Sequence, residues 1–225
     1  MNETTLTATH AVEIAVDGGR IAADVTVPKD GHGVIVFAHG SGSSRFSPRN
    51  RAVATALQRA SFATVLADLL TSAEAAEDEM TGRLRFDIPL LARRVIALLD
   101  WLSAQPGLRD QPVGLFGAST GAAAALSAAA VRPDRVGAVV SRGGRPDLAD
   151  QHLPQVRAPT LLIVGGNDTE VIRLNRLALV PLTCEALLAI VPGATHLFEE
   201  TGALEQVTAK ATAWFQDHLV KAAAS

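Results

Sequence analysis

Short apolar segments alternate with helix-like segments over most of this 225-residue chain, and this alternation restricts the possible folds more than any other feature. Each apolar segment is bounded by glycine, proline or polar residues, as expected for strands that are buried on both faces. We place such strands at residues 34–38, 62–66, 113–116, 136–140, 161–164 and 186–191. N-caps, helical spacing of apolar residues and terminating proline or glycine predict helices after Ser47, from Ile88 to near Pro106, from Ala122, and over residues 169–179 and 203–220.

Strands that alternate with helices predict a mainly parallel sheet with helices on both faces, because each return to a parallel strand needs a crossover. Residues 10–16 and 21–27 flank a turn at Asp17 and are expected to form an antiparallel hairpin. We expect one α/β domain over residues 1–225. The Ala- and Glu-rich residues 71–80 are expected to form a mobile surface loop, and residues 142–158 a short connection.

The composition indicates a globular protein without nucleic-acid or membrane partners. The chain is 48% hydrophobic and 19% charged with a net charge of −3, so it lacks the positive charge that attracts nucleic acid or an anionic membrane. No apolar stretch reaches the roughly 20 residues needed to span a bilayer. Residues 1–5 lack a basic region followed by an apolar run, so no signal peptide is expected, and the single cysteine, Cys184, excludes an internal disulfide. We therefore expect a cytoplasmic protein, and the sequence leaves its oligomeric state open.

Residues 117–121 read Gly-Ala-Ser-Thr-Gly, a G-x-S-x-G pattern that makes Ser119 the candidate nucleophile. The pattern lies between an expected strand and an expected helix, the context in which a sharp turn exposes the serine hydroxyl. Glycine, serine and alanine are abundant in this chain, so the bare pattern could also arise by chance. The placement between strand and helix favours the catalytic interpretation.

A serine nucleophile needs a base, and His196 follows the last expected strand. Asp168 follows the strand before it, so the chain order is Ser119, Asp168, His196, as in hydrolases with the G-x-S-x-G turn. All three residues follow parallel strands and should meet at one edge of the sheet. Asp168 could instead serve only as a helix N-cap, and Asp147 is the reserve candidate for the acid that orients the histidine.

Residues 39–44, His-Gly-Ser-Gly-Ser-Ser, follow the strand 34–38 and are expected to form an oxyanion loop. Acyl transfer needs two N–H donors aimed at the developing oxyanion. We assign these donors to the backbone N–H groups of Ser41 and of Thr120, the residue after the nucleophile. An ordinary glycine-rich turn is the alternative. A nucleotide site is excluded because the loop lacks the G-x-x-x-x-G-K-[ST] pattern.

With these residues in order, the chain resembles the α/β-hydrolase superfamily over nearly its full length, and within it the compact dienelactone hydrolase-like branch. The resemblance implies a serine hydrolase with an α/β-hydrolase fold. The best-known member of that branch has a cysteine nucleophile where this chain has Ser119, so lactone specificity does not follow from the resemblance. The superfamily often inserts a lid domain after the strand that here ends near residue 140. Residues 143–158 are too few for one, so no cap domain is expected.

Arginines are expected near the same sheet edge, and Arg45 and Arg142 are the candidates for holding an anionic substrate group through bidentate bonds. The alternative is that both are solvated surface residues. No cluster of histidine, cysteine and carboxylates has the spacing of metal ligands, so we expect no metal and no cofactor.

The sequence therefore predicts a serine hydrolase that cleaves an ester, lactone or thioester of a small soluble substrate through an acyl-enzyme intermediate. A site without a cap favours small or short-chain substrates, including anionic ones. A peptidase and a non-catalytic binding protein on the same fold are the alternatives.

Overall fold

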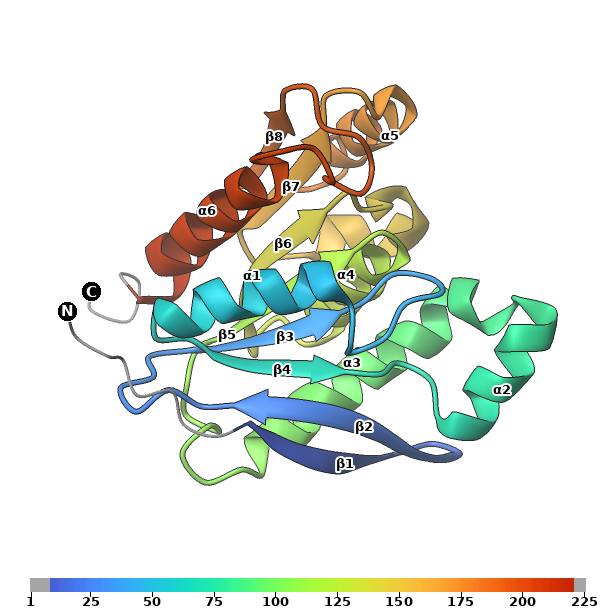
Figure 1. Cartoon of the computed structure of the whole chain (residues 1–225), viewed down its shortest axis with the longest axis vertical. Coiled ribbons are helices and arrows are strands. Elements are labelled where there is room, and N and C mark those ends of the chain that lie inside the picture. The colour runs from blue at the N-terminus through green and yellow to red at the C-terminus, as the bar shows by residue number, and fades with distance from the viewer. Residues whose placement is uncertain (1–8, 221–225) are drawn as a thin grey trace.

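An eight-stranded sheet runs through the molecule (Figure 1). The computed structural model describes residues 9–220. The strands are β1 (His10–Val16), β2 (Gly19–Thr26), β3 (Val34–Ala38), β4 (Ala63–Ala67), β5 (Val113–Ala118), β6 (Val136–Arg142), β7 (Thr160–Gly165) and β8 (Ala186–Val191). Their order across the sheet is β1-β2-β4-β3-β5-β6-β7-β8.

The sheet is parallel from β4 to β8, and the antiparallel hairpin β1–β2 extends it at one edge. The predicted hairpin is thus confirmed, with Val16 paired to Gly19 across the turn. The direction of winding changes at β3, because β4 lies on one side of it and β5 on the other. Open α/β sheets bind ligands at such a switch point, beyond the carboxyl ends of the strands.

Helices cover both faces of the sheet (Figure 1). The α-helices are α1 (Pro48–Arg59), α2 (Ser72–Thr81), α3 (Ile88–Ser103), α4 (Thr120–Val131), α5 (Thr169–Leu179) and α6 (Ala203–Phe215), with shorter helical segments η1 (Leu84–Phe86), η2 (Pro146–Gln155) and η3 (Gln216–Val220). One hydrophobic cluster lies between the sheet and α3, α4 and η2. A second lies between the opposite face and α1 and α6.

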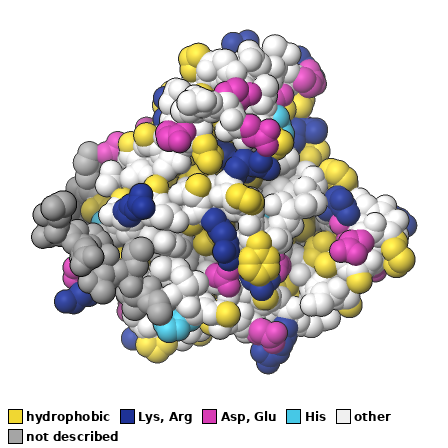
Figure 2. Space-filling view, viewed as in Figure 1, with side chains coloured by type: hydrophobic (Ala, Val, Ile, Leu, Met, Phe, Trp, Pro, Cys, Tyr) yellow, Lys and Arg dark blue, Asp and Glu magenta, His cyan; other side chains and the backbone are white. Residues whose placement is uncertain are grey.

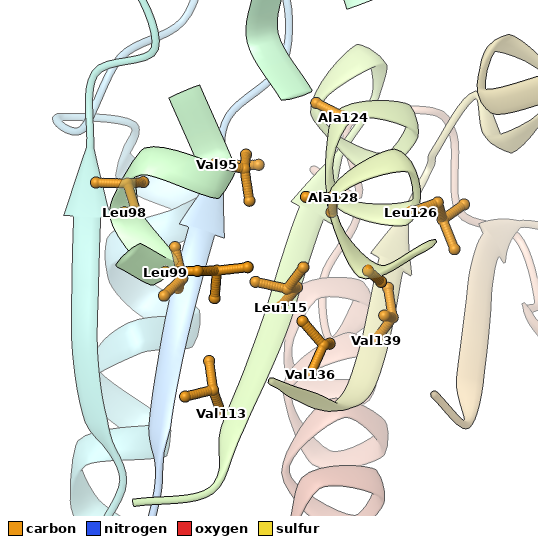
Figure 3. Packing of buried hydrophobic residues seen from close by; sticks show 14 of the residues in the cluster. Val95, Leu98, Leu99, Val113, Leu115, Ala124, Leu126, Ala128, Val136 and Val139 are labelled. Atoms are coloured by element: carbon orange, nitrogen blue, oxygen red, sulfur yellow. The ribbon is translucent and has the colours of Figure 1, made fainter. Parts of the chain in front are cut away.

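The first cluster shows how small residues bring α4 onto the sheet. Figure 3 shows part of this cluster, with Val95, Leu98 and Leu99 from α3, Ala124, Leu126 and Ala128 from α4, Val113 and Leu115 from β5, and Val136 and Val139 from β6. Nearly every residue of α4 is buried, and most are alanine. Because alanine adds little bulk and is the best helix former, α4 can lie close to the sheet and still be covered by its neighbours.

The structure confirms the predicted α/β sheet with helices on both faces, and no cap domain follows β6 in the described part of the chain. The N-terminus of α1 is as expected, since the Ser47 hydroxyl accepts a hydrogen bond from the Asn50 N–H at 3.4 Å. No helix within residues 9–220 is long and apolar enough to cross a membrane. The prediction of no signal peptide rests on residues 1–5, which lie outside the described residues.

The expected mobile loop at residues 71–80 is wrong, because α2 occupies most of this segment. The Glu74 N–H donates to the Thr71 hydroxyl at 3.2 Å, and the Thr71 N–H donates to the Glu74 carboxylate at 2.8 Å. This reciprocal capping box starts the helix, and Gly82 ends it in the left-handed conformation (φ 63°). The expected short connection at residues 142–158 also holds a helical segment, η2.

Two ion pairs hold α2 in place beside the sheet. Arg94 of α3 is almost fully buried and donates to the Glu74 carboxylate at 2.6 Å and to the Asp17 carbonyl at 2.8 Å. The buried Asp78 carboxylate accepts from the Arg85 guanidinium at 2.6 Å and from the Leu84 N–H at 2.7 Å. The segment α2–η1 is therefore tied both to the body of the protein and to itself.

Candidate active site

Four segments that follow parallel strands meet at the carboxyl edge of the sheet. Ser119 follows β5, Asp168 follows β7 and His196 follows β8, while the loop 39–44 follows β3. Because β3 and β5 are neighbours at the switch point, the loop lies directly beside the serine. The structure thus brings together the residues that the sequence nominated for acyl transfer.

Ser119 occupies a strained turn between β5 and α4. Its backbone lies at φ 50° and ψ −123°, a conformation that non-glycine residues rarely adopt and that functional sites retain at a cost. The flanking glycines make room for it. A Cβ on Gly117 would come within 2.8 Å of the Ala122 nitrogen, and one on Gly121 would overlap the Ala38 and His39 carbonyl oxygens. The turn therefore requires glycine at both positions and holds Ser119 at the tip.

The imidazole of His196 is hydrogen-bonded to Asp168, with Nδ1 and Oδ2 2.6 Å apart. The reserve acid, Asp147, instead accepts from the Arg145 guanidinium at 2.7 Å. His196 is 40% exposed and Asp168 15%, so the ring stays accessible to a substrate while the carboxylate is sheltered. This arrangement leaves Nε2 as the ring atom free to accept a proton.

His196 also lies against the residues that support Ser119. The Ser119 N–H donates to the Arg142 carbonyl at 3.3 Å. Gly143, the next residue, is so close to the histidine that a Cβ there would lie 3.5 Å from the imidazole Cε1. No hydrogen bond joins the Ser119 hydroxyl to His196 within residues 9–220, and nucleophile–base contacts are often loose before substrate binds.

The loop 39–44 packs directly on the nucleophile. A Cβ on Gly40 would lie 2.9 Å from the Ser119 Cβ, so the loop can approach the serine only with glycine there. Ser41 follows in the same loop, and Thr120 is the first residue of α4, whose N–H has no partner within the helix. Ser41 directly follows Gly40, which packs on Ser119, and Thr120 directly follows Ser119, so both predicted oxyanion donors belong to segments that border the nucleophile.

His39 fixes the position of this loop, a role that the sequence analysis did not assign. Its Nε2 accepts a hydrogen bond from the Leu69 N–H at 3.1 Å, so Nδ1 carries the ring hydrogen and donates to the Gly40 carbonyl at 2.9 Å. Burial lowers the pKa of His39, against smaller opposing effects of the Gly40 hydrogen bond and of Asp68. The neutral ring thus links the end of β4 to the oxyanion loop.

We expect His39 to make the protein less stable as the pH falls below the ordinary histidine pKa of 6.5. In that range the unfolded chain takes up a proton that the folded ring resists, so the unfolded state binds more protons and stability is lost, by at most about 1.4 kcal/mol per pH unit. Above that range the His39 ring is neutral in both the folded and the unfolded state, and its contribution to stability is fully present. Urea denaturation between about pH 5 and pH 8 measures the effect.

The comparison needs two variants. His39→Gln should show a flatter loss of stability toward acid than the wild type, whereas His10→Gln, at an exposed residue of β1, should follow the wild type. Parallel curves for the wild type and His39→Gln would contradict the expectation.

Arg45 and Arg142, the predicted substrate ligands, have different surroundings. Arg45 pairs with Asp68 through both its backbone N–H, at 2.8 Å, and its guanidinium, and its Nε lies 3.6 Å from Asp24. Its charge is thus already neutralised, which argues against a role in holding a substrate anion. Arg142 lies at the end of β6 and is 8% exposed. Burial, and then the nearby charge of Arg49, lower the pKa of Arg142 to about 10, so it is charged at neutral pH.

A cavity of about 400 Å³ borders the oxyanion loop. It lies between this loop and the α2–η1 segment, and its lining includes Ser41, Ser43, Leu70, Asp78 and Arg85. The volume is in the range of small-molecule sites. The capping box at Thr71 is the sequence signal that could have predicted α2, the helix that forms one side of this cavity.

The fold and this arrangement of residues define an α/β-hydrolase. The model of the dienelactone hydrolase family matches residues 20–219, so the chain belongs to that family. Within the described residues, no group of three or more histidine, cysteine and acidic side chains is placed to hold a metal.

Solved structures are similar to this chain over nearly its whole length. The crystal structure of dienelactone hydrolase from Anabaena variabilis ATCC 29413 is 53% identical, with a TM-score of 0.92, and the match covers 94% of this chain and 98% of that one. Est1E from Butyrivibrio proteoclasticus shares the fold at 16% identity and a TM-score of 0.76, over 93% of this chain and 99% of that one.

Two longer relatives come from Mycobacterium tuberculosis, strains CDC 1551 and H37Rv. Each is named "Putative phosphoribosyl transferase" and is 54% identical over 208 residues, which are 92% of this chain and 46% of the relative. The chain therefore spans less than half the length of these curated relatives.

Proposed function

We propose that this chain is a serine hydrolase that cleaves an ester, lactone or thioester of a small substrate through an acyl-enzyme intermediate. The observation that carries the proposal is the 2.6 Å contact between Asp168 and His196 at the same sheet edge as the strained Ser119 turn. A nucleophile, a base and an orienting acid in this relation form the arrangement that activates a serine hydroxyl.

In the first half-reaction, the Ser119 hydroxyl attacks the substrate carbonyl carbon and His196 Nε2 takes its proton. Asp168 holds the Nδ1 hydrogen and stabilises the imidazolium that forms. The backbone N–H groups of Ser41 and Thr120 stabilise the oxyanion of the tetrahedral intermediate. Collapse of this intermediate breaks the bond to the leaving group, which receives the proton from His196.

In the second half-reaction, water attacks the acyl-enzyme while His196 Nε2 accepts its proton. The second tetrahedral intermediate uses the same two N–H donors. Its collapse releases the carboxylic acid, and the proton returns to the Ser119 hydroxyl. The chain's own side chains supply every proton transfer in this cycle.

A fluorophosphonate probe tests the proposal directly, because it phosphonylates an activated serine. We expect stoichiometric labelling of the wild type, at a peptide that contains Ser119, and none of Ser119→Ala. Absence of labelling in folded wild-type protein would contradict the proposal and favour a non-catalytic binding protein on the same fold. Labelling together with hydrolysis of peptides but not esters would favour a peptidase.

The cavity beside the oxyanion loop is the proposed acyl pocket. Ser41, whose N–H is a proposed oxyanion donor, lines this cavity, so a substrate bound beside Ser41 has space there for its acyl group. The lining is mixed: serines of the loop, Asp78 and Arg85 face the same space as Leu70 and Leu91. We infer that the pocket accepts short or polar acyl groups.

Activity should therefore not increase with the length of an apolar acyl chain. A pocket with an apolar lining gains up to about 0.8 kcal/mol per methylene, or nearly fourfold in kcat/KM. Here we expect kcat/KM for p-nitrophenyl esters to be flat or to fall beyond the butyrate, because further methylenes meet charged groups. A steady rise from acetate to octanoate would show that the acyl group binds elsewhere.

The transferase named for the M. tuberculosis relatives is not proposed for this chain, since the match covers less than half of those proteins. A cytoplasmic location and a small-molecule substrate remain part of the proposal. Figure 2 shows basic and acidic side chains interspersed on one face of the molecule, which offers no broad basic surface there.

A further inference from the structure

Arg142 is a buried cation without a counter-ion. Its Nη2 donates to the Asn50 side-chain carbonyl at 3.3 Å, while its Nε and Nη1 are buried and have no hydrogen-bond partner. No ion pair joins it to a carboxylate within residues 9–220. Buried guanidinium groups are normally paired, because an uncompensated charge in the interior is costly.

A second arginine increases the local positive charge. Arg49, in the first turn of α1, is close enough to Arg142 to lower its pKa, and its own Nε is also buried without a partner. The outer side of Arg49 is neutralised, since Nη1 lies 3.1 Å from the exposed Glu199 carboxylate. Three buried nitrogen atoms on two arginines therefore lack an acceptor for their hydrogens.

We propose that Arg142 and Arg49 bind a small oxyanion, a carboxylate or phosphate-type group, beside the Ser119 turn. Water could accept the unpaired hydrogens, but it would not relieve the repulsion between two guanidinium groups. An oxyanion does both, and its paired oxygens match the donor geometry of a guanidinium. The backbone of Arg142 adjoins the reacting groups, because its carbonyl accepts from the Ser119 N–H and Gly143, the next residue, lies close to His196.

Inorganic phosphate is the probe for binding, and the Ser119→Ala protein is the host, so that the result does not depend on hydrolysis. At about ten times its dissociation constant, phosphate should raise the melting temperature by roughly 3–6 °C over sodium chloride of equal ionic strength. The rise should disappear in Arg142→Met and in Arg49→Gln. Arg109→Gln, which removes an exposed arginine far along the chain, is the matched control and should keep it.

Arg142→Met keeps the buried side-chain volume and removes an unpaired charge, so we expect it to fold. If it does not, Arg49→Gln decides alone, because Arg49 is partly exposed. The proposal is overturned if phosphate gives the Ser119→Ala protein no rise beyond sodium chloride. It is also overturned if phosphate raises the melting temperature of the folded Arg142→Met or Arg49→Gln protein as much as that of Arg109→Gln.

Kinetics with the active enzyme then identify the source of the anion, a step that rests on the proposed hydrolase function. If the site receives an anionic group of the substrate, phosphate competes with an anionic ester. Arg142→Met then raises the KM for the anionic ester about tenfold to a hundredfold, while the KM for a neutral ester of equal size does not change. If the site holds a free anion, phosphate and the anionic ester bind independently. Arg142→Met then changes the KM of the anionic and the neutral ester equally. Both results support the oxyanion site, and the melting experiment stands if neither ester is hydrolysed.

Discussion

Ser119→Ala is expected to lower kcat for ester hydrolysis by about 10⁴- to 10⁶-fold without unfolding the protein. The hydroxyl is the only atom lost, and it belongs to the residue at the tip of the strained turn between β5 and α4. Steady-state kinetics of the purified variant measure the loss. Relief of strain is not expected, since alanine also carries a Cβ at φ 50°.

Ser127→Ala is the matched control for this substitution. Ser127 lies on the same helix, α4, and its buried hydroxyl has no hydrogen-bond partner. Its loss should leave kcat within about twofold and stability within about 1 kcal/mol of the wild type. Wild-type turnover by Ser119→Ala, in protein shown to be free of contaminating esterase, would rule out Ser119 as the nucleophile.

Asp168→Asn is expected to lower kcat by about 10³- to 10⁴-fold, because an amide can neither fix the Nδ1 tautomer of His196 nor stabilise the imidazolium. The carboxylate lies 2.6 Å from the ring nitrogen, so the substitution changes charge and hydrogen bonding while preserving shape. KM should change little if the side chain does not touch the substrate.

Asp147→Asn distinguishes the two candidate acids. Asp147 is paired with Arg145, two residues before it, whereas the carboxylate bound to His196 is that of Asp168. We expect this variant to keep kcat within about threefold of the wild type, as for a partly exposed ion pair. A large loss in Asp147→Asn together with near-normal activity in Asp168→Asn would reverse the assignment.

The sequence predicted the elements whose signals are local. The buried strands, the N-cap Ser47 and the helix Thr169–Leu179 each follow from a run of neighbouring residues, and the structure places them where expected. The chain order of Ser119, Asp168 and His196 was also readable, because each follows its own strand. Parallel strands carry such residues to one edge without further information.

The remaining features depend on contacts between distant segments. The helix α2 buries only Asp78 and has no apolar stripe, so periodicity gave no signal for it, and its stability comes from its caps and from Arg94. No local sequence pattern predicted the burial of Arg142 either. An arginine that ends a strand normally reaches solvent, and here α1 covers it through Asn50. Pairing of Arg45 with Asp68 likewise joins residues that no local pattern connects.

The position of the α2–η1 segment has a consequence for how this protein could change its substrate. The segment joins β4 to α3 and contributes no strand, and none of its hydrophobic side chains belongs to the two buried clusters. One of its anchors, the Arg94–Glu74 pair, includes neither Ala75 nor Glu79, which line the cavity, whereas Arg85, a third lining residue, pairs with the buried Asp78 and holds the segment together. Substitutions at Ala75 and Glu79 would change the shape and charge of the cavity while both ion pairs and the reacting groups stay in place. If the cavity is the acyl pocket proposed above, selectivity is separable from folding, and a library confined to Ala75 and Glu79 would sample new substrates without disturbing the ion pairs that hold the segment.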